Sequence, residues 1–133
     1  MNPDYNGTDY EGVSYLQLST RGGVRSSTAM GYLHGMTNPS LRFETEAVVT
    51  RILLEGRRAV GVEYEQNGAR VCAYANREVI LSAGPLKSPQ ILELSGIGNP
   101  DVLKANGIPV AHELPGVGEN LIHADTAAED GAL

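Results

Sequence analysis

The chain has 133 residues, enough for one domain at most, and its 41% hydrophobic and 20% charged residues are typical of an ordinary globular protein. A net charge of −6 argues against a nucleic-acid-binding surface, which needs a basic stripe, and no apolar run approaches the roughly 18 residues of a membrane span. Residues 1–12 lack the pattern of a secretory signal, and a lone Cys72 leaves no internal disulfide, so composition leaves the cellular compartment open.

The first third of the chain is expected to contain a loop, one strand and one short helix. Breaker pairs such as Asn-Pro and Asn-Gly predict a loop over residues 1–12. Residues 13–20 alternate weakly and predict a strand, after which an Arg-Gly-Gly turn follows. A short helix is expected over residues 25–35, with Ser26 or Ser27 capping its start and Gly35 closing its end.

The middle of the chain predicts a small antiparallel meander. Apolar residues alternate and then become denser over residues 41–54. Further alternating segments cover residues 59–66 and 69–76. Between them stands Asn67-Gly68, a strong hairpin signal because both residues adopt positive φ at little cost.

A different kind of strand is expected over residues 77–84. Residues 79–81 are continuously apolar, which is typical of a strand buried on both faces. The segment ends in three small residues, Ser82, Ala83 and Gly84. Small residues at the end of a buried strand allow another backbone or a ligand to approach closely.

Two short helices built on the same capping logic are expected next. Ser88 is predicted as the N-cap of the first, with Pro89 at the first helical position and Gly96 at the end. Asn99-Pro100 repeats this start, and Asn106-Gly107 ends the second helix. The chain then becomes extended and rich in turns, and its tail shows no periodicity.

No catalytic or metal-ligating residue can be assigned from these patterns. The Gly-x-Gly pairs at residues 96–98 and 116–118 lack the strand-before and helix-after context of the dinucleotide fingerprint, so turn glycines are the preferred interpretation. The three histidines, His34, His112 and His123, are far apart, and His123 with a nearby Asp125 is too few ligands for a metal site. No serine stands in a Gly-x-Ser-x-Gly elbow.

One long pattern carries a family resemblance. It has fixed residues at fixed spacing, and it reads Gly84-Pro85-x-x-Ser88-Pro89-x-Ile91-Leu92-x-x-Ser95-Gly96-Ile97-Gly98. This resembles the second signature of the glucose–methanol–choline (GMC) family of FAD-dependent oxidoreductases. The similarity extends in order and spacing over residues 4–121, and in style it is closest to the choline dehydrogenases and related alcohol dehydrogenases.

The resemblance implies a fold class. The family joins a flavin-binding α/β domain to a substrate domain with an antiparallel sheet. Residues 1–121 would be a mixed α+β fragment, the central part of a FAD/NAD(P)-binding domain with the edge of the substrate domain. Residues 122–133 match nothing recognisable in the family and form an unmatched tail.

The resemblance also implies a function and a cofactor. Family members oxidise alcohols, with hydride passing from the alcohol carbon to FAD. Val49 matches the strand residue whose backbone contacts the FAD adenine, and Ser82, Ala83 and Gly84 match a strand end that passes close to the cofactor. Residues 84–98 would then shape a wall of the site and carry no chemistry themselves.

Two parts of the family pattern have no counterpart in this chain. They are the phosphate-binding glycine loop and the C-terminal segment with the catalytic histidine. We therefore expect a fragment without activity of its own, whose partners are the missing N- and C-terminal segments and, in the complete enzyme, a small alcohol. Two alternatives stay open: a non-enzymatic remnant that binds a full-length relative through exposed edges, and a small adenine-nucleotide binder that uses only the Val49 region.

Overall fold

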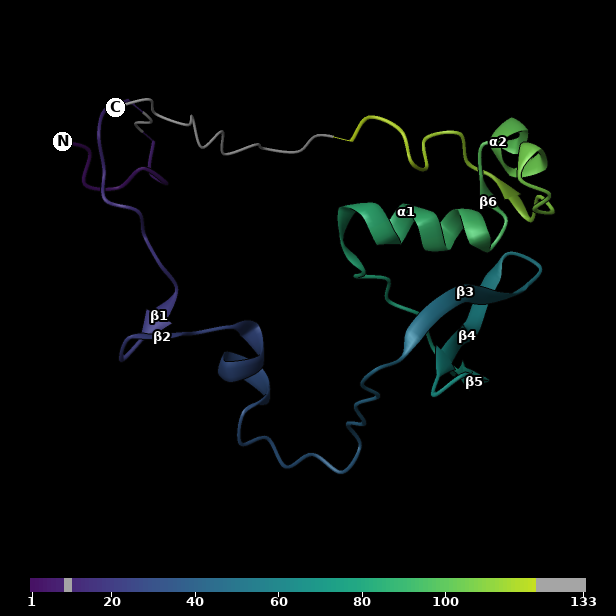
Figure 1. Ribbon diagram of the computed structural model, residues 1–133, viewed down its shortest axis with the longest axis horizontal. Coiled ribbons are helices and arrows are strands. Elements are labelled where there is room, and N and C mark those ends of the chain that lie inside the picture. Colours follow the sequence, from purple (N-terminus) through teal and green to yellow (C-terminus); the bar gives the residue numbers. More distant parts are fainter. Residues whose placement is uncertain (9–10, 122–133) are drawn as a thin grey trace. The chain divides into compact units, whose positions relative to one another are not determined.

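The computed structural model describes residues 1–8 and 11–121. The chain divides into two compact units, the first spanning Met1–Phe43 and the second beginning at Glu44 (Figure 1). In the described ranges, no helix is both long enough and apolar enough to cross a bilayer. The second unit holds the larger sheet and the two α-helices, and it is the unit that contains the candidate site.

The first unit contains one small hairpin. Strands β1 (Thr20–Arg21) and β2 (Val24–Arg25) pair antiparallel. Gly22 and Gly23 between them have φ of 58° and 77°, so the expected turn is confirmed. The expected strand over residues 13–20 is wrong, because only its last residue is in a strand. Its large apolar side chains are exposed, and an alternating segment forms a strand only where a partner pairs with it.

The expected helix of the first unit is shorter than the sequence suggests. A single π-helical turn, η1 (Ala29–Leu33), replaces the helix predicted over residues 25–35. Ser27 Oγ accepts from the Met30 N–H at 3.3 Å, as a capping serine does, and Gly35 has φ of 78°, which confirms the closing glycine. Gly31 lies within the turn, and glycine lowers helix propensity.

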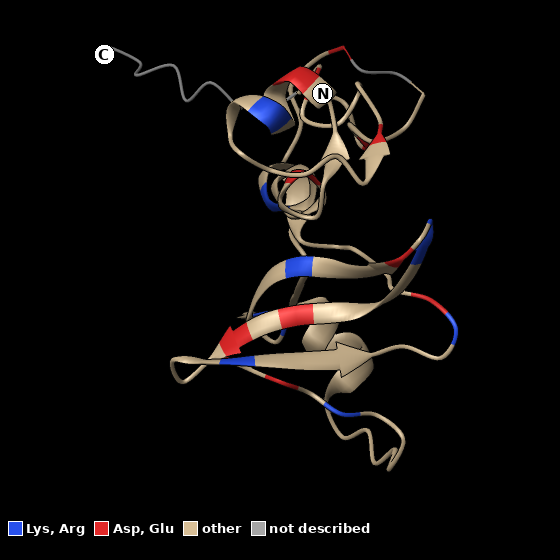
Figure 2. Cartoon of the chain, turned by 90° about the vertical axis from the view of Figure 1, so that its right-hand side faces the viewer, with Lys and Arg blue, Asp and Glu red and all other residues tan. Residues whose placement is uncertain are grey.

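The second unit is built on a three-stranded antiparallel sheet. Strands β3 (Val48–Glu55), β4 (Arg58–Gln66) and β5 (Ala69–Tyr74) lie in the order β3-β4-β5, and they confirm the expected meander. Asn67 and Gly68 have φ of 53° and 75°, so the hairpin turn is confirmed too. Arginines and acidic residues are interspersed along these strands (Figure 2).

The first of these strands begins later than expected. The alternation from residue 41 predicts a strand that starts there, but β3 begins at Val48. Glu46 has φ of 55°, a left-handed conformation that interrupts an extended backbone. Gln66 Nε2 donates to the Thr45 carbonyl at 2.8 Å, which ties the segment before β3 to the end of β4.

The expected buried strand over residues 77–84 is wrong. Residues 77–83 form no strand, and the side chain of Ile80 is 78% exposed. Strands need a hydrogen-bonded neighbour, and none of the described strands pairs with this segment. The apolar run signals burial against something, but it does not specify the partner.

Helix α1 (Gly84–Leu94) begins earlier than predicted. The expected N-cap at Ser88 is wrong, because Pro85 already occupies the first turn, where a missing N–H costs nothing. Ser88 lies inside the helix, and its Oγ accepts from the Ala83 N–H at 3.1 Å. The helix ends as predicted, at Gly96 with φ of 81°.

The last described part forms a helix flanked by a small parallel pair of strands. Strands β6 (Ile97–Gly98) and β7 (His112–Glu113) pair on either side of helix α2 (Pro100–Ala105). Asn99 accepts from the Asp101 N–H at 3.0 Å, which confirms the predicted cap. Helix and strands thus make the mixed α/β fragment that the sequence indicates, apart from the missing buried strand. The predicted tail lies outside the described residues.

Candidate functional site

A cavity of about 630 Å³ lies in the second unit, between strand β3, helix α1 and the segment that leads into α1. Figure 1 shows α1 beside β3, with that segment leading from the end of β5 into α1. Small-molecule sites have volumes of this order and are mostly apolar. The lining residues come from the β3 region (47–50 and Ile52), β4 (Val62), the connecting segment (79–83) and α1 (Lys87, Gln90, Ile91 and Leu94).

The cavity brings together most of the residues that the sequence singled out for cofactor binding. Val49 lines it from β3, while Ser82 and Ala83 line it from the connecting segment more than thirty positions later. Gly84 does not line it; this residue opens α1 with φ of 86°. Residues from two separate segments therefore share one cavity, although their role toward a cofactor stays a prediction.

The lining is suited to binding and not to proton transfer. Its polar side chains are Thr50, Ser82, Lys87 and Gln90, and Lys87 Nζ donates to Gln90 Oε1 at 2.8 Å. The described lining residues include no Asp, Glu, His or Cys that could act as a general base. This arrangement can hold a largely apolar group with a polar edge, and it offers no carboxylate, imidazole or thiol for the acid–base step of a reaction.

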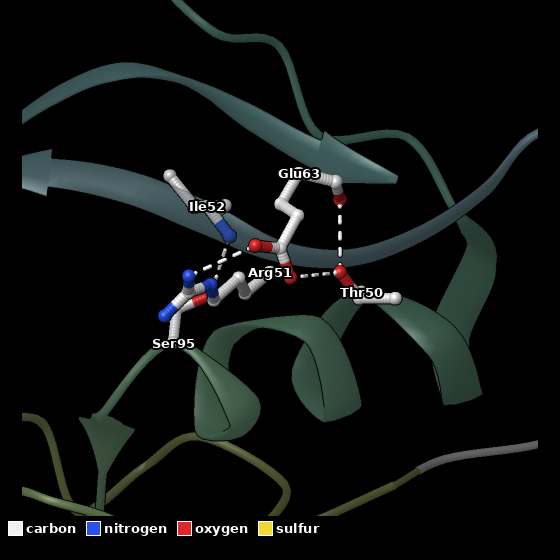
Figure 3. A network of polar contacts seen from close by, with 5 residues as sticks. All are labelled: Thr50, Arg51, Ile52, Glu63 and Ser95. Carbon is white, nitrogen blue, oxygen red and sulfur yellow. Dashed lines mark hydrogen bonds and ion pairs between the residues drawn. The ribbon is translucent and has the colours of Figure 1, made fainter. Parts of the chain in front are cut away.

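A polar network beside the cavity holds an irregular point in β3. The register between β3 and β4 shifts between Val49 and Arg51, as at a β-bulge. Thr50 Oγ1 lies 3.2 Å from the Glu63 carbonyl and 3.0 Å from Glu63 Oε1, and Arg51 Nη2 pairs with Glu63 Oε2 at 2.9 Å (Figure 3). Glu63, only 8% exposed, thus reaches both residues that follow Val49.

The electrostatics of this network keep Glu63 ionised. The hydrogen bond from Arg51, followed by the hydrogen bond from Thr50, holds the pKa of the Glu63 carboxyl below its ordinary value of 4.5, although partial burial opposes the shift. The sequence analysis missed Glu63. Its only signal is an acidic residue between the apolar Val62 and Tyr64, which does not reveal the bulge that it stabilises.

A second contact joins the sheet to the helix. The Ile52 N–H donates to Ser95 Oγ at 2.8 Å (Figure 3). Ser95 Oγ in turn donates to the Ile91 carbonyl. Ser95 is a fixed position of the family pattern, but the sequence gives it no role. Only the structure shows that its hydroxyl connects the end of α1 to β3.

The Gly-x-Gly pairs act as turns and close-approach points. At Gly96 a Cβ atom would collide with the Pro109 carbonyl oxygen, and at Gly118, with φ of 81°, it would lie 3.1 Å from Glu93 Oε1. Gly116, by contrast, faces open space. Their interpretation as structural glycines is confirmed for Gly96 and Gly118.

The histidines stay without an assigned role. His34 belongs to the first unit, His112 lies in β7, and His123 with Asp125 is outside the described residues. Over residues 1–8 and 11–121, no group of three or more His, Cys, Asp or Glu residues is placed to hold a metal ion.

Comparison with known families assigns the chain. The sequence profile described as GMC oxidoreductase matches residues 1–124. The chain belongs to the GMC oxidoreductase family. This agrees with the resemblance that the signature over residues 84–98 indicates, and it covers both units of the structure.

Curated relatives of this GMC chain are choline dehydrogenases. The mitochondrial choline dehydrogenase of Homo sapiens is 51% identical over 122 residues, which are 91% of this chain and 20% of that protein. The oxygen-dependent choline dehydrogenase of Chromohalobacter salexigens is 54% identical over 120 residues, 89% of this chain and 22% of that protein. The chain thus spans about one fifth of the length of the curated relatives that it matches.

Solved structures of oxidoreductases resemble the GMC chain as well. Pyridoxine 4-oxidase from Mesorbium loti aligns with a TM-score of 0.59 at 30% identity, covering 72% of this chain and 19% of that one. A FAD-dependent oxidoreductase from Chaetomium thermophilum aligns with a TM-score of 0.52 at 42% identity, covering 53% of this chain and 13% of that one. The mixed helix and strand fold is therefore shared with oxidoreductases of known structure.

Proposed function

We propose that this chain forms part of a FAD-dependent oxidoreductase that acts on the CH–OH group of a small alcohol of the choline type. Within it, the cavity beside β3 receives the adenine end of FAD. The observation that carries the proposal is that Val49, Ser82 and Ala83, which the family resemblance matches to positions near the cofactor, line one cavity. Family membership and the printed names of the relatives support the same cofactor and reaction class.

The residues present fit an adenine group. The lining is mostly apolar, which suits the faces of a planar base, and the small side chains of Ser82 and Ala83 leave room for close approach. The bulge next to Val49 interrupts the strand ladder, and a bulge leaves backbone groups of its strand unpaired by the neighbour. Such groups can bond the polar edge of a base. Gly84, in this proposal, positions the start of α1 at the rim.

The residues that line the cavity indicate which parts of the reaction FAD would supply and which the protein would supply. When bound, FAD supplies the capacity to accept a hydride from an alcohol carbon. The described residues bind and orient its adenine end and exclude water from it. Because the lining residues include no His, Asp, Glu or Cys, we expect the acceptor of the hydroxyl proton to lie outside this cavity. We therefore expect the 133-residue chain by itself not to oxidise alcohols.

The same proposal assigns the domain organisation. Residues 1–121 form the central part of a FAD-binding domain with the edge of a substrate domain, and the small alcohol binds elsewhere in the complete enzyme. The chain's short span along its relatives supports this arrangement. In it, the other four fifths of such an enzyme supply the phosphate-binding glycine loop and the proton acceptor.

The decisive experiment measures flavin content in a chimera. Residues 1–121 of this chain replace the matched segment of human choline dehydrogenase, and Ala83→Trp is introduced. Because a large ring at Ala83 fills the cavity, we expect the flavin-to-polypeptide absorbance ratio to fall about tenfold or more, as a loss of roughly 1.4 kcal/mol in binding would produce. Ala69→Trp, on exposed β5, is the matched control. Equal flavin content in both variants would contradict the proposed site.

A second candidate function is an interaction fragment that binds a full-length relative. The observation that favours it is the exposure of large apolar side chains that line the cavity, namely Val48, Ile80 and Leu94. Co-purification of the tagged chain with a co-expressed choline dehydrogenase tests it. Retention of AMP by the chain after desalting, without any partner, would instead favour the small adenine-nucleotide binder.

A further inference from the structure

The Ser95 hydroxyl makes two hydrogen bonds, one to strand β3 and one to helix α1. Ser95 directly follows the last residue of α1, and its Oγ accepts from the Ile52 N–H of β3 at 2.8 Å. The strand order β3-β4-β5 puts β3 at an edge of its sheet. Ser95 therefore takes the place that a carbonyl of a neighbouring strand would have.

The residues that Ser95 joins are themselves walls of the cavity. Ile52 lines it from β3 and Ile91 lines it from α1, and their side chains are only 8% and 6% exposed. The hydroxyl accepts from the backbone of Ile52 and donates to the backbone of Ile91. One hydroxyl thus connects β3 to α1 at Ile52 and Ile91, two buried residues of the cavity walls.

The position of Ser95 is itself fixed by the helix end. The Ser95 N–H bonds the carbonyls of Ile91 and Leu92 at 3.1 and 3.0 Å, and Gly96 then turns the chain with φ of 81°. A group that both donates and accepts is required here. Alanine would leave the Ile52 N–H without its acceptor, whereas threonine retains the hydroxyl.

The strand is held at a second point close by. Thr50 and Arg51 are bonded to Glu63 of β4, which fixes the bulge directly after Val49 (Figure 3). Ser95 binds the next residue of β3, Ile52, and does so from the α1 side of the strand, opposite β4. The Glu63 and Ser95 contacts together restrict the movement of β3 relative to α1. Because Val49 belongs to β3, they also fix its position relative to the helix.

Resting on the function proposed above, we propose that Ser95 is a positioning residue of the cofactor site. Its hydroxyl fixes the separation of α1 from β3 and thereby the width of the cavity between Val49 and the helix. Ser95 does not line the cavity, so it acts on a bound group only through the two walls that it joins.

The test uses the full 133-residue chain labelled with ¹⁵N for hydrogen exchange, and the choline dehydrogenase chimera described above for FAD binding. Ser95→Ala removes the hydroxyl, Ser95→Thr retains it, and Ser40→Ala, exposed in the first unit, is the control. Amide hydrogen exchange at Ile52 reports its hydrogen bond to Ser95, and the Val62 amide of the paired strand serves as internal reference. The affinity of the chimera for FAD, followed by flavin fluorescence, reports the state of the cavity.

We expect the Ile52 amide to exchange about tenfold faster in Ser95→Ala, and FAD to bind about tenfold more weakly, as the loss of one buried hydrogen bond predicts. Ser95→Thr should restore both values to within about twofold, which a merely structural defect would not do. If Ser95→Ala unfolds the second unit, Ser95→Cys, which keeps the volume and weakens the bonds, replaces it.

Two results would overturn the proposal: unchanged Ile52 exchange in Ser95→Ala, or faster exchange with unchanged FAD affinity. Failure of the proposed function looks different. There Ala83→Trp leaves the flavin content of the choline dehydrogenase chimera unchanged, which overturns the cofactor site, and Ile52 exchange alone then decides whether Ser95 holds the two walls together.

Discussion

At the scale of single residues, Glu63 explains how an acidic side chain is accommodated within a mostly apolar strand. Its carboxylate receives hydrogen bonds from Arg51 and Thr50, and these stabilise the charged form. The side chain is nearly buried, so its bonds also satisfy an acceptor that solvent barely reaches. One residue therefore holds the irregular point of β3 that adjoins the cavity.

The lowered pKa of Glu63 predicts a pH dependence of stability. Since the folded pKa lies below the unfolded value near 4.5, the folded state binds fewer protons in that window. The stabilisation is therefore fully present above the unfolded pKa and is lost as pH falls through the folded one. Urea unfolding of the chain and of Glu63→Gln should differ clearly at about pH 7 and converge at about pH 2–3.

The control for this prediction is Glu65→Gln, which changes an exposed glutamate on the same strand. Its free energy of unfolding should follow that of the unsubstituted chain at both pH values. A difference between the chain and Glu63→Gln that stays constant with pH would show that the charge of Glu63 does not stabilise the bulge.

At the scale of elements, the end of α1 decides how the helix meets the rest of its unit. The helix ends before Gly96, whose backbone lies close to residues 109–111. The N–H groups of Ala111 and His112 both donate to the Gly96 carbonyl. A positive φ and a close approach coincide at this one residue. These two requirements explain why a glycine follows Ser95, the residue whose hydroxyl connects the end of α1 to β3.

Gly96→Ala is therefore expected to destabilise the chain more than an ordinary glycine substitution. Left-handed φ costs about 1–2 kcal/mol for a residue with Cβ, and the collision with the Pro109 carbonyl adds to it, for a total of about 3 kcal/mol. Gly107→Ala is the matched control, because Gly107 also has positive φ, 69°, but faces open space. Urea unfolding measures both. Equal losses in the two variants would show that the close approach at Gly96 is unimportant.

At the scale of the whole molecule, the described units leave large apolar side chains in contact with solvent. In the second unit Val48, Ile80 and Leu94 are among these and line the cavity, where residues 79–81 carry the sequence pattern of a buried strand without forming one. Contiguous exposed apolar surface of this kind marks interaction sites or association-prone surfaces.

We accordingly expect the purified chain to self-associate through this surface. Sedimentation velocity should show an average sedimentation coefficient that rises with concentration. Ile80→Asn, which places a polar group on the exposed segment, should reduce that rise, whereas Leu16→Asn in the first unit should reduce it less. A chain that sediments as a monomer at every concentration would contradict the expectation.

Local signals in the sequence determined several elements correctly. The Asn67-Gly68 turn, the Asn99 cap and the glycine at the end of α1 each depend on the conformation of one or two residues, so the sequence is sufficient to place them. The family followed from the long fixed pattern over residues 84–98, and the profile match confirmed it.

Tertiary structure alone decided the rest. The apolar residues 79–81 predict burial, but a strand forms only where a neighbouring strand supplies hydrogen bonds. The sequence of this segment alone does not identify that neighbour. Val49 and Ala83 share a cavity because a helix packs on the edge of a sheet, and Ser95 and Glu63 matter because that packing brings distant backbone and side-chain groups within hydrogen-bond distance. Periodicity reports the environment of each residue, whereas a site depends on which residues meet, and long-range packing determines that.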